Sequence, residues 1–151
     1  MKSSRWVFIQ ARVLMIFLLA ACSSVATPDP NALKPSKPGG TGEALKLTGD
    51  AAQGRTVFDS KCRECHGEEG KGGVANGGAE SGVVPALNPI AASLKNSDAK
   101  VFAANIDLFI EHGSVPKGTP IRIMMAYGDN GLLSPQQIAD VIAYIISLNT
   151  Q

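Results

Sequence analysis

The sequence predicts a small all-α domain of three to five helices. Two segments, 98–112 and 134–148, have helix start and stop signals, and a shorter candidate helix spans 50–62. No segment alternates apolar and polar residues as a half-buried strand would. The 151 residues suffice for one domain of ordinary size plus extensions. A formal net charge of +1 gives no reason to expect nucleic acid as a partner.

Residues 1–21 have the features of a bacterial lipoprotein signal peptide. A basic start precedes an unbroken apolar run, Val13 to Ala21, which is shorter than the roughly 20 residues of a transmembrane helix. The run ends in Ala20-Ala21-Cys22, which resembles the lipobox whose cysteine is lipidated and becomes the mature first residue. The alternative is an uncleaved membrane anchor with an incidental cysteine. Either arrangement predicts a domain tethered to the cell membrane on its periplasmic or extracytoplasmic side.

Residues 22–48 predict a flexible tether that starts at the lipidated Cys22. Pro, Gly, Ser, Thr and Ala dominate the segment, and it has no apolar periodicity. A coil of about 27 residues spans roughly 30 Å on average and reaches about 90 Å when fully extended. We therefore expect the domain to swing between membrane partners, unless the segment packs along a partner protein.

The folded domain is expected at residues 49–151, and its first helix is predicted to end near Cys62. Asp50 is the candidate N-cap of this helix. Gly54 inside the helix costs about 1 kcal/mol relative to alanine. A glycine at this position indicates close packing against another helix, with Phe58 on the same face.

The other two helices have clearer end signals. Asp98 is placed to cap the second helix, and Gly113 to stop it. In the third helix Ser134 is the N-cap, Pro135 takes the first position and Gln137 completes a capping box. The third helix then has apolar residues at helical spacing, which predicts one buried face: Ile138, Val141, Ile142, Ile145 and Leu148.

The first helix leads into a C-x-x-C-H motif, Cys62-Arg63-Glu64-Cys65-His66. This spacing is typical of c-type haem attachment, in which each thiol adds to a haem vinyl group and the histidine binds the iron. The alternatives are a chance CxxC, half of a zinc site and a thioredoxin-like redox motif. Zinc needs four ligands, and only Cys22 and His112 remain to complete them. A thioredoxin-like motif needs a βαβ pattern, which is missing, so we expect one covalent haem c.

Irregular segments follow the motif and the second helix. Residues 67–82 are rich in glycine but lack the strand and the ending of a phosphate-binding loop, so we expect them to wrap a haem edge. The apolar residues 83–89 include two prolines and should be extended. Residues 114–131 contain an apolar patch that needs a surface to bury against.

Together these elements resemble a class I mono-haem cytochrome c of the lipoprotein type, over residues 49–149. The CxxCH helix, the Pro85-Ala86-Leu87 turn, the middle helix ending in His112-Gly113, a methionine loop and the helix with Tyr144 follow in that family's order. In size and layout the chain is also similar to the lipoprotein mono-haem subunit of alternative complex III.

The resemblance implies roles for individual residues. Cys62 and Cys65 would form the thioether links, and His66 would be the proximal iron ligand. The carbonyl of Pro85 would accept from the other ring nitrogen of this histidine, and Leu87 would pack on the haem face. The first helix would meet the last one through Gly54 and Phe58, near Tyr144.

The sixth ligand implied by the resemblance is a methionine. The family's Met-Pro-Ala-aromatic string is similar to Met124-Met125-Ala126-Tyr127, which makes Met124 the ligand and Met125 the alternative. A third option is His112 as a second histidine ligand.

Histidine and methionine ligation closes both axial positions and suits electron transfer. The resemblance therefore implies a single-electron carrier rather than an enzyme, in a respiratory or photosynthetic chain. It would be a shuttle or a subunit of a quinol-oxidising complex, with a terminal oxidase, a reductase or a reaction centre as further partners. The alternatives are a peroxidase-like haem enzyme with a labile sixth ligand and a non-haem redox or zinc lipoprotein.

Overall fold

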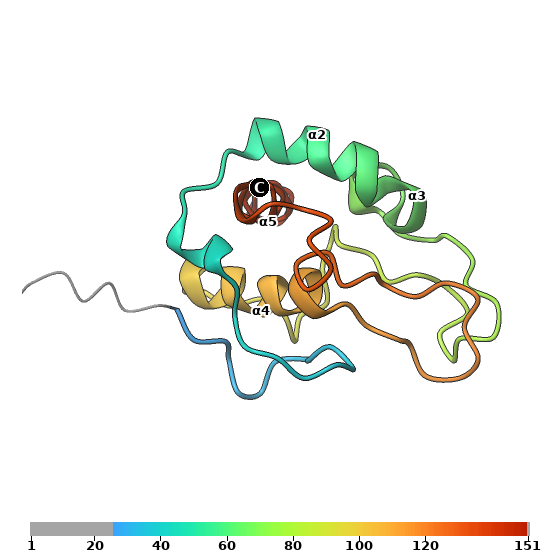
Figure 1. Ribbon diagram of the computed structural model, residues 1–151. Coiled ribbons are helices and arrows are strands. Elements are labelled where there is room, and N and C mark those ends of the chain that lie inside the picture. The colour runs from blue at the N-terminus through green and yellow to red at the C-terminus, as the bar shows by residue number, and fades with distance from the viewer. Residues whose placement is uncertain (1–25, 151) are drawn as a thin grey trace, which may run out of the picture.

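The computed structural model describes residues 26–150, in which the regular secondary structure is helical. The elements in chain order are η1 (Glu43–Lys46), α2 (Ala51–Lys61), α3 (Arg63–His66), η2 (Glu68–Gly70), α4 (Ala99–His112) and α5 (Pro135–Ser147). Residues 26–150 form no β-strand, and four isolated β-bridges connect the loops. Figure 1 shows α5 end-on between α2 and α4. The predicted all-α class is confirmed, whereas the predicted signal peptide and Cys22 lie outside the described residues.

The three predicted helix starts are present, each with its side-chain cap. The carboxylate of Asp50 accepts from two backbone N–H groups at the start of α2, and Asp98 does the same for α4. Ser134 and Gln137 form the reciprocal capping box of α5. Because these caps satisfy orphan N–H groups locally, short-range sequence signals were enough to place them.

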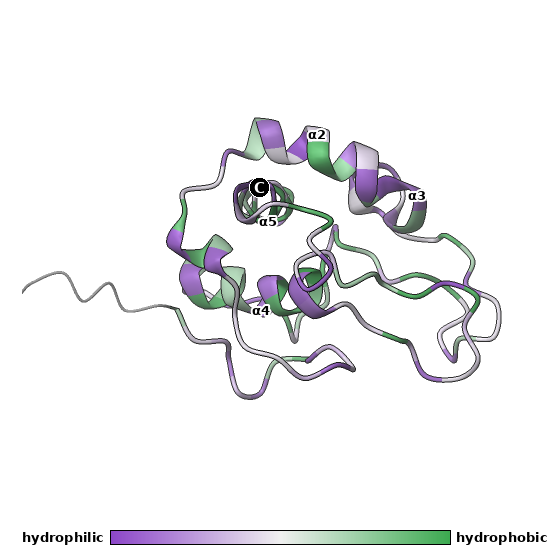
Figure 2. Cartoon of the chain, viewed as in Figure 1, coloured by the Kyte–Doolittle hydropathy of each residue, from purple (hydrophilic) through white to green (hydrophobic). Residues whose placement is uncertain are grey.

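The contact between α2 and α5 is the centre of the core. The helix α2 mixes hydrophilic and hydrophobic residues (Figure 2), and its buried residues are Gly54 and Phe58. A Cβ on Gly54 would collide with the backbone carbonyl of Asp140 and with Tyr144, so only glycine permits this approach. Phe58 is fully buried, and its ring centroid lies 5.3 Å from that of Tyr144 at 60°. The predicted packing of Gly54 and Phe58 is therefore confirmed.

Residues 26–48, which we call the strap, differ from the flexible tether predicted for them. They run along α4 (Figure 1), and Ala44 is buried in the core with 1% of its surface exposed. The backbone N–H groups of Asp29 and Gly42 donate to side chains of α4. A segment without apolar periodicity packs here because its backbone N–H groups bond to α4 side chains, in addition to the burial of Ala44. Nowhere between residues 26 and 150 is a helix both long enough and apolar enough to cross a membrane.

Candidate haem site

The CxxCH residues sit on a sharp bend between α2 and α3. Cys62 is both the C-cap of α2 and the N-cap of α3. Its carbonyl accepts from the N–H groups of Cys65 at 3.1 Å and His66 at 2.9 Å. Both cysteines are half-buried free thiols. Burial raises the pKa of the Cys62 thiol to about 12, so its surroundings favour a neutral sulfur. A thioether to haem is neutral and suits such a place.

The imidazole of His66 is held in one orientation by the carbonyl of Pro85. The distance from Nδ1 of His66 to this carbonyl oxygen is 3.0 Å, and only a protonated Nδ1 can donate to it. The tautomer is then fixed, and Nε2 keeps the lone pair that a metal ion needs. Burial lowers the pKa of His66, which also favours the neutral ring. Leu87 lies two residues beyond the proline, partly buried against the core.

The segment with the two methionines is attached to both neighbouring helices. Ser114, just after α4, exchanges two backbone hydrogen bonds with Met124, at 3.1 and 2.9 Å. The hydroxyl of Tyr127 donates to the carbonyl of Lys61 at 2.9 Å, directly before the CxxCH motif. Met124 is partly buried against the core, whereas Met125 is 47% exposed. These positions favour Met124 as the side chain that faces the site.

Two residues of the site were not singled out by the sequence. Asn76 is 1% exposed, and its side-chain amide forms hydrogen bonds with both the N–H and the carbonyl of Arg122. The Arg122 guanidinium lies 3.5 Å from the carboxylate of Glu64 and 3.9 Å from Sγ of Cys65. An asparagine in a glycine-rich loop is typical of a turn, so the sequence did not predict this link between Asn76 and Arg122, which we call the Asn76 clamp.

The side chains brought together here fit a haem. Two thiols, an imidazole with a fixed tautomer and a half-buried thioether are the donor types that c-type haem uses. Cys62, Leu87, Met124 and Tyr127 all belong to the partly buried apolar border of the core. In addition, Nε of Arg122 beside the motif is buried and has no hydrogen-bond partner among residues 26–150. A large, mostly apolar group with some polar edge would complete these contacts.

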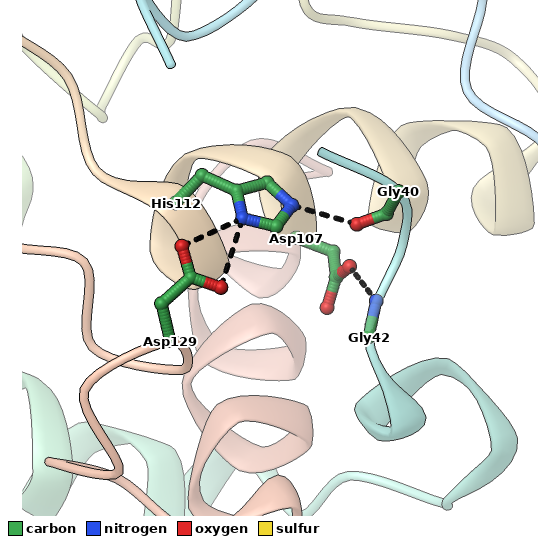
Figure 3. A network of polar contacts seen from close by, with 5 residues as sticks. All are labelled: Gly40, Gly42, Asp107, His112 and Asp129. Atoms are coloured by element: carbon green, nitrogen blue, oxygen red, sulfur yellow. Dashed lines mark hydrogen bonds and ion pairs between the residues drawn. The ribbon is translucent and has the colours of Figure 1, made fainter. Parts of the chain in front are cut away.

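His112, the third option for the sixth ligand, is engaged elsewhere. Its Nδ1 lies 3.0 Å from a carboxylate oxygen of Asp129, and its Nε2 lies 2.7 Å from the carbonyl of Gly40 (Figure 3). Both ring nitrogens are therefore occupied, and neither is left for iron. Across residues 26–150, no group of three or more His, Cys, Asp or Glu side chains is arranged to hold a metal ion.

An all-α domain with a CxxCH bend and a methionine loop bonded to the helix before that bend is typical of c-type haem proteins. The family model for cytochrome c matches residues 51–149, and the chain belongs to this family. The chain is also similar, at 32% identity over 103 residues, to the cbb3-type cytochrome c oxidase subunit CcoP of Azospirillum sp. (strain B510). The match covers 65% of this chain but only 30% of that protein. No solved structure gave a significant match.

Family membership establishes the cofactor and the general role. A cytochrome c carries a covalently bound haem c, and Cys62 and Cys65 have the spacing that its attachment requires. The protein is therefore an electron-transfer haem protein.

Proposed function

We propose that this protein is a membrane-tethered mono-haem cytochrome c that transfers single electrons, with His66 and Met124 as the axial ligands. Cys62 and Cys65 would form the thioether links. The observation that supports this best is the 3.0 Å contact between Nδ1 of His66 and the carbonyl of Pro85, since it prepares Nε2 for iron.

A bound haem would supply an iron that changes between the ferric and ferrous states. Around it, Pro85 orients the proximal imidazole and raises its basicity through the hydrogen bond. Leu87 and Tyr127 contribute apolar surface that excludes water, which limits solvent rearrangement when the charge of the site changes. As an iron ligand, the thioether sulfur of Met124 would favour the ferrous state and so raise the reduction potential. With both His66 and Met124 bound to the iron, no coordination position would be left for oxygen or peroxide, which favours a carrier over an enzyme.

The anchor and the partners are also part of this proposal. The lipobox-like Ala20-Ala21-Cys22 supports lipidation at Cys22 and a position on the outer face of the cell membrane. The relative with 32% identity is by name an oxidase subunit, which supports partners in a respiratory chain. A quinol-oxidising complex such as alternative complex III, or a terminal oxidase, would exchange electrons with the haem. Mass spectrometry of the purified chain tests both modifications, since haem and lipid each add a defined mass.

The ligand assignment is tested by replacing each methionine in turn. We expect Met124→Ala to abolish the near-infrared band of methionine bound to ferric iron and to lower the reduction potential. Met125→Ala is the matched control, because its side chain is 47% exposed, and should preserve the band. Loss of the band in Met125→Ala but not in Met124→Ala would instead identify Met125 as the iron ligand. A band missing from the wild-type protein would contradict methionine ligation altogether.

A further inference from the structure

The strap is attached to α4 at three points along its length. The N–H of Asp29 donates to the side-chain oxygen of Asn105 at 2.9 Å, and the N–H of Gly42 donates to Asp107 at 2.7 Å. Between them, the carbonyl of Gly40 lies 2.7 Å from Nε2 of His112. Figure 3 shows the second and third of these contacts side by side at the end of α4.

The α4 side chains that hold the strap are themselves fixed. Asn105 is 1% exposed and also donates to the carbonyl of Leu94, while Asp107 is fully buried. The His112 ring is held from its other side by Asp129. Since rigid partners lose little entropy on binding, bonds to them hold the strap better than bonds to mobile surface side chains would.

Burial of apolar groups completes the attachment. Ala44 in η1 belongs to the core cluster, and η1 packs against both α4 and α5. Ala32, nearer the start of the strap, is also buried. The strap is therefore held at its start, middle and end, and it is not a coil that happens to touch the surface.

The reach of the domain from its anchor changes as a result. A free coil over residues 23–49 would reach about 90 Å, but a docked strap leaves only the residues from Cys22 to the first attachment at Asp29 as tether. Those seven residues, 23–29, span at most about 25 Å. We propose that the docked strap holds the haem domain close to its membrane anchor, so that it serves a membrane protein beside it rather than swinging between distant partners.

This inference rests on the proposed lipid anchor at Cys22, and it selects between the two modes of the proposed function. A domain with a reach of about 25 Å acts as a fixed module of a membrane complex, whereas one with a reach of about 90 Å acts as a shuttle. The partner implied is an integral membrane redox protein whose own electron-accepting centre lies near the membrane surface. Such a partner gains from a high effective concentration, which falls as a tether lengthens.

Two neighbouring glycines of the strap allow a matched test. A Cβ on Gly39 would collide with the His112 ring, whereas a Cβ on Gly40 would meet no atom of the described residues within 4 Å. We expect Gly39→Ala to speed hydrogen exchange of residues 26–48 by about tenfold, because the ring must move and release the strap. Gly40→Ala should exchange like the wild-type protein. Exchange of the wild-type strap at the rate of an unstructured peptide would overturn the docking.

The reach is measured on the full, haem-loaded chain in phospholipid vesicles with a fluorophore on the lipid headgroups. The haem quenches this fluorophore, so time-resolved emission reports the distribution of haem heights above the membrane. We expect a narrow distribution for the wild type and Gly40→Ala, and a broader one extending further out for Gly39→Ala. Equally broad distributions in all three would overturn the short reach. An absence of lipid mass on Cys22 would instead contradict the proposed anchor, and the exchange rates would still decide the docking.

Discussion

The α2–α5 crossing and the strap–α4 face are both buried contacts between distant parts of the chain, but they are built from different groups. The crossing depends on a glycine that admits a carbonyl and on aromatic packing between Phe58 and Tyr144. The strap depends on backbone groups that bond to buried polar side chains, Asn105 and Asp107. Burial of apolar side chains leaves a periodic pattern in the sequence, whereas backbone-to-side-chain bonds do not. This difference explains why one contact was predicted and the other was not.

The largest expected effect is at the crossing. Gly54→Val should lower the free energy of unfolding by about 3 kcal/mol or more, because its side chain would push α5 away at the backbone of Asp140. Thr56→Val, at an exposed position of the same helix, should change it by less than about 0.5 kcal/mol. Denaturant unfolding of the haem-loaded protein, followed by haem absorbance, measures both. Equal effects from the two variants would show that the crossing is not a tight one.

A smaller, pH-dependent effect is expected on the strap side. Burial raises the pKa of Asp107 to about 6, the charge of Glu111 adds to this, and the Gly42 N–H and His112 oppose it. Because the folded-state pKa of Asp107 lies above its unfolded value, the folded state prefers the protonated carboxyl group. This preference stabilises the fold fully at pH below about 4, and the stabilisation is lost as pH rises through about 6. Asp107→Asn does not ionise and keeps an oxygen for Gly42.

The stability difference between this variant and the wild type should therefore shift in favour of Asp107→Asn between pH 4 and pH 7. The expected shift is roughly 1–3 kcal/mol, since one pKa unit corresponds to about 1.4 kcal/mol. Unfolding curves at several pH values measure it, and the comparison cancels the titration of groups that the two proteins share. A difference that does not vary with pH would mean that Asp107 titrates normally.

The smallest effect on stability is expected from the polar pair beside the haem motif. Arg122→Gln removes a positive charge near Cys65, so it should lower the reduction potential, because positive charge favours the ferrous state. Its effect on unfolding should stay within about 1 kcal/mol, since the pair with Glu64 is partly exposed. Arg55→Gln, which breaks a similar pair with Asp59 on the exposed side of α2, is the control. Equal reduction potentials in the two variants would show that the charge of Arg122 does not act on the haem.

The site was only partly predictable, for reasons that particular residues make clear. The CxxCH motif is local, so five consecutive residues were enough to predict the haem. The contact between His66 and Pro85 spans 19 positions and was expected only through the family resemblance. The string Met124-Met125-Ala126-Tyr127 favoured Met124 through the family resemblance, and the partial burial of Met124 beside an exposed Met125 supports the same choice. The Asn76 clamp on Arg122 joins two irregular loops through hydrogen bonds and left no signal at all.

The sequence by itself determined the three capped helices, the all-α class and the covalent haem. Each of these depends on groups a few residues apart, such as Asp50 with its N–H partners or Cys62 with Cys65. Only the tertiary structure decided that residues 26–48 lie on α4 and that Asn76 binds the backbone of Arg122. In both cases the outcome depends on which distant groups remain to be buried or bonded once the helices have packed. The reach of the domain from its proposed anchor therefore depends on the fold and not on the number of residues between them.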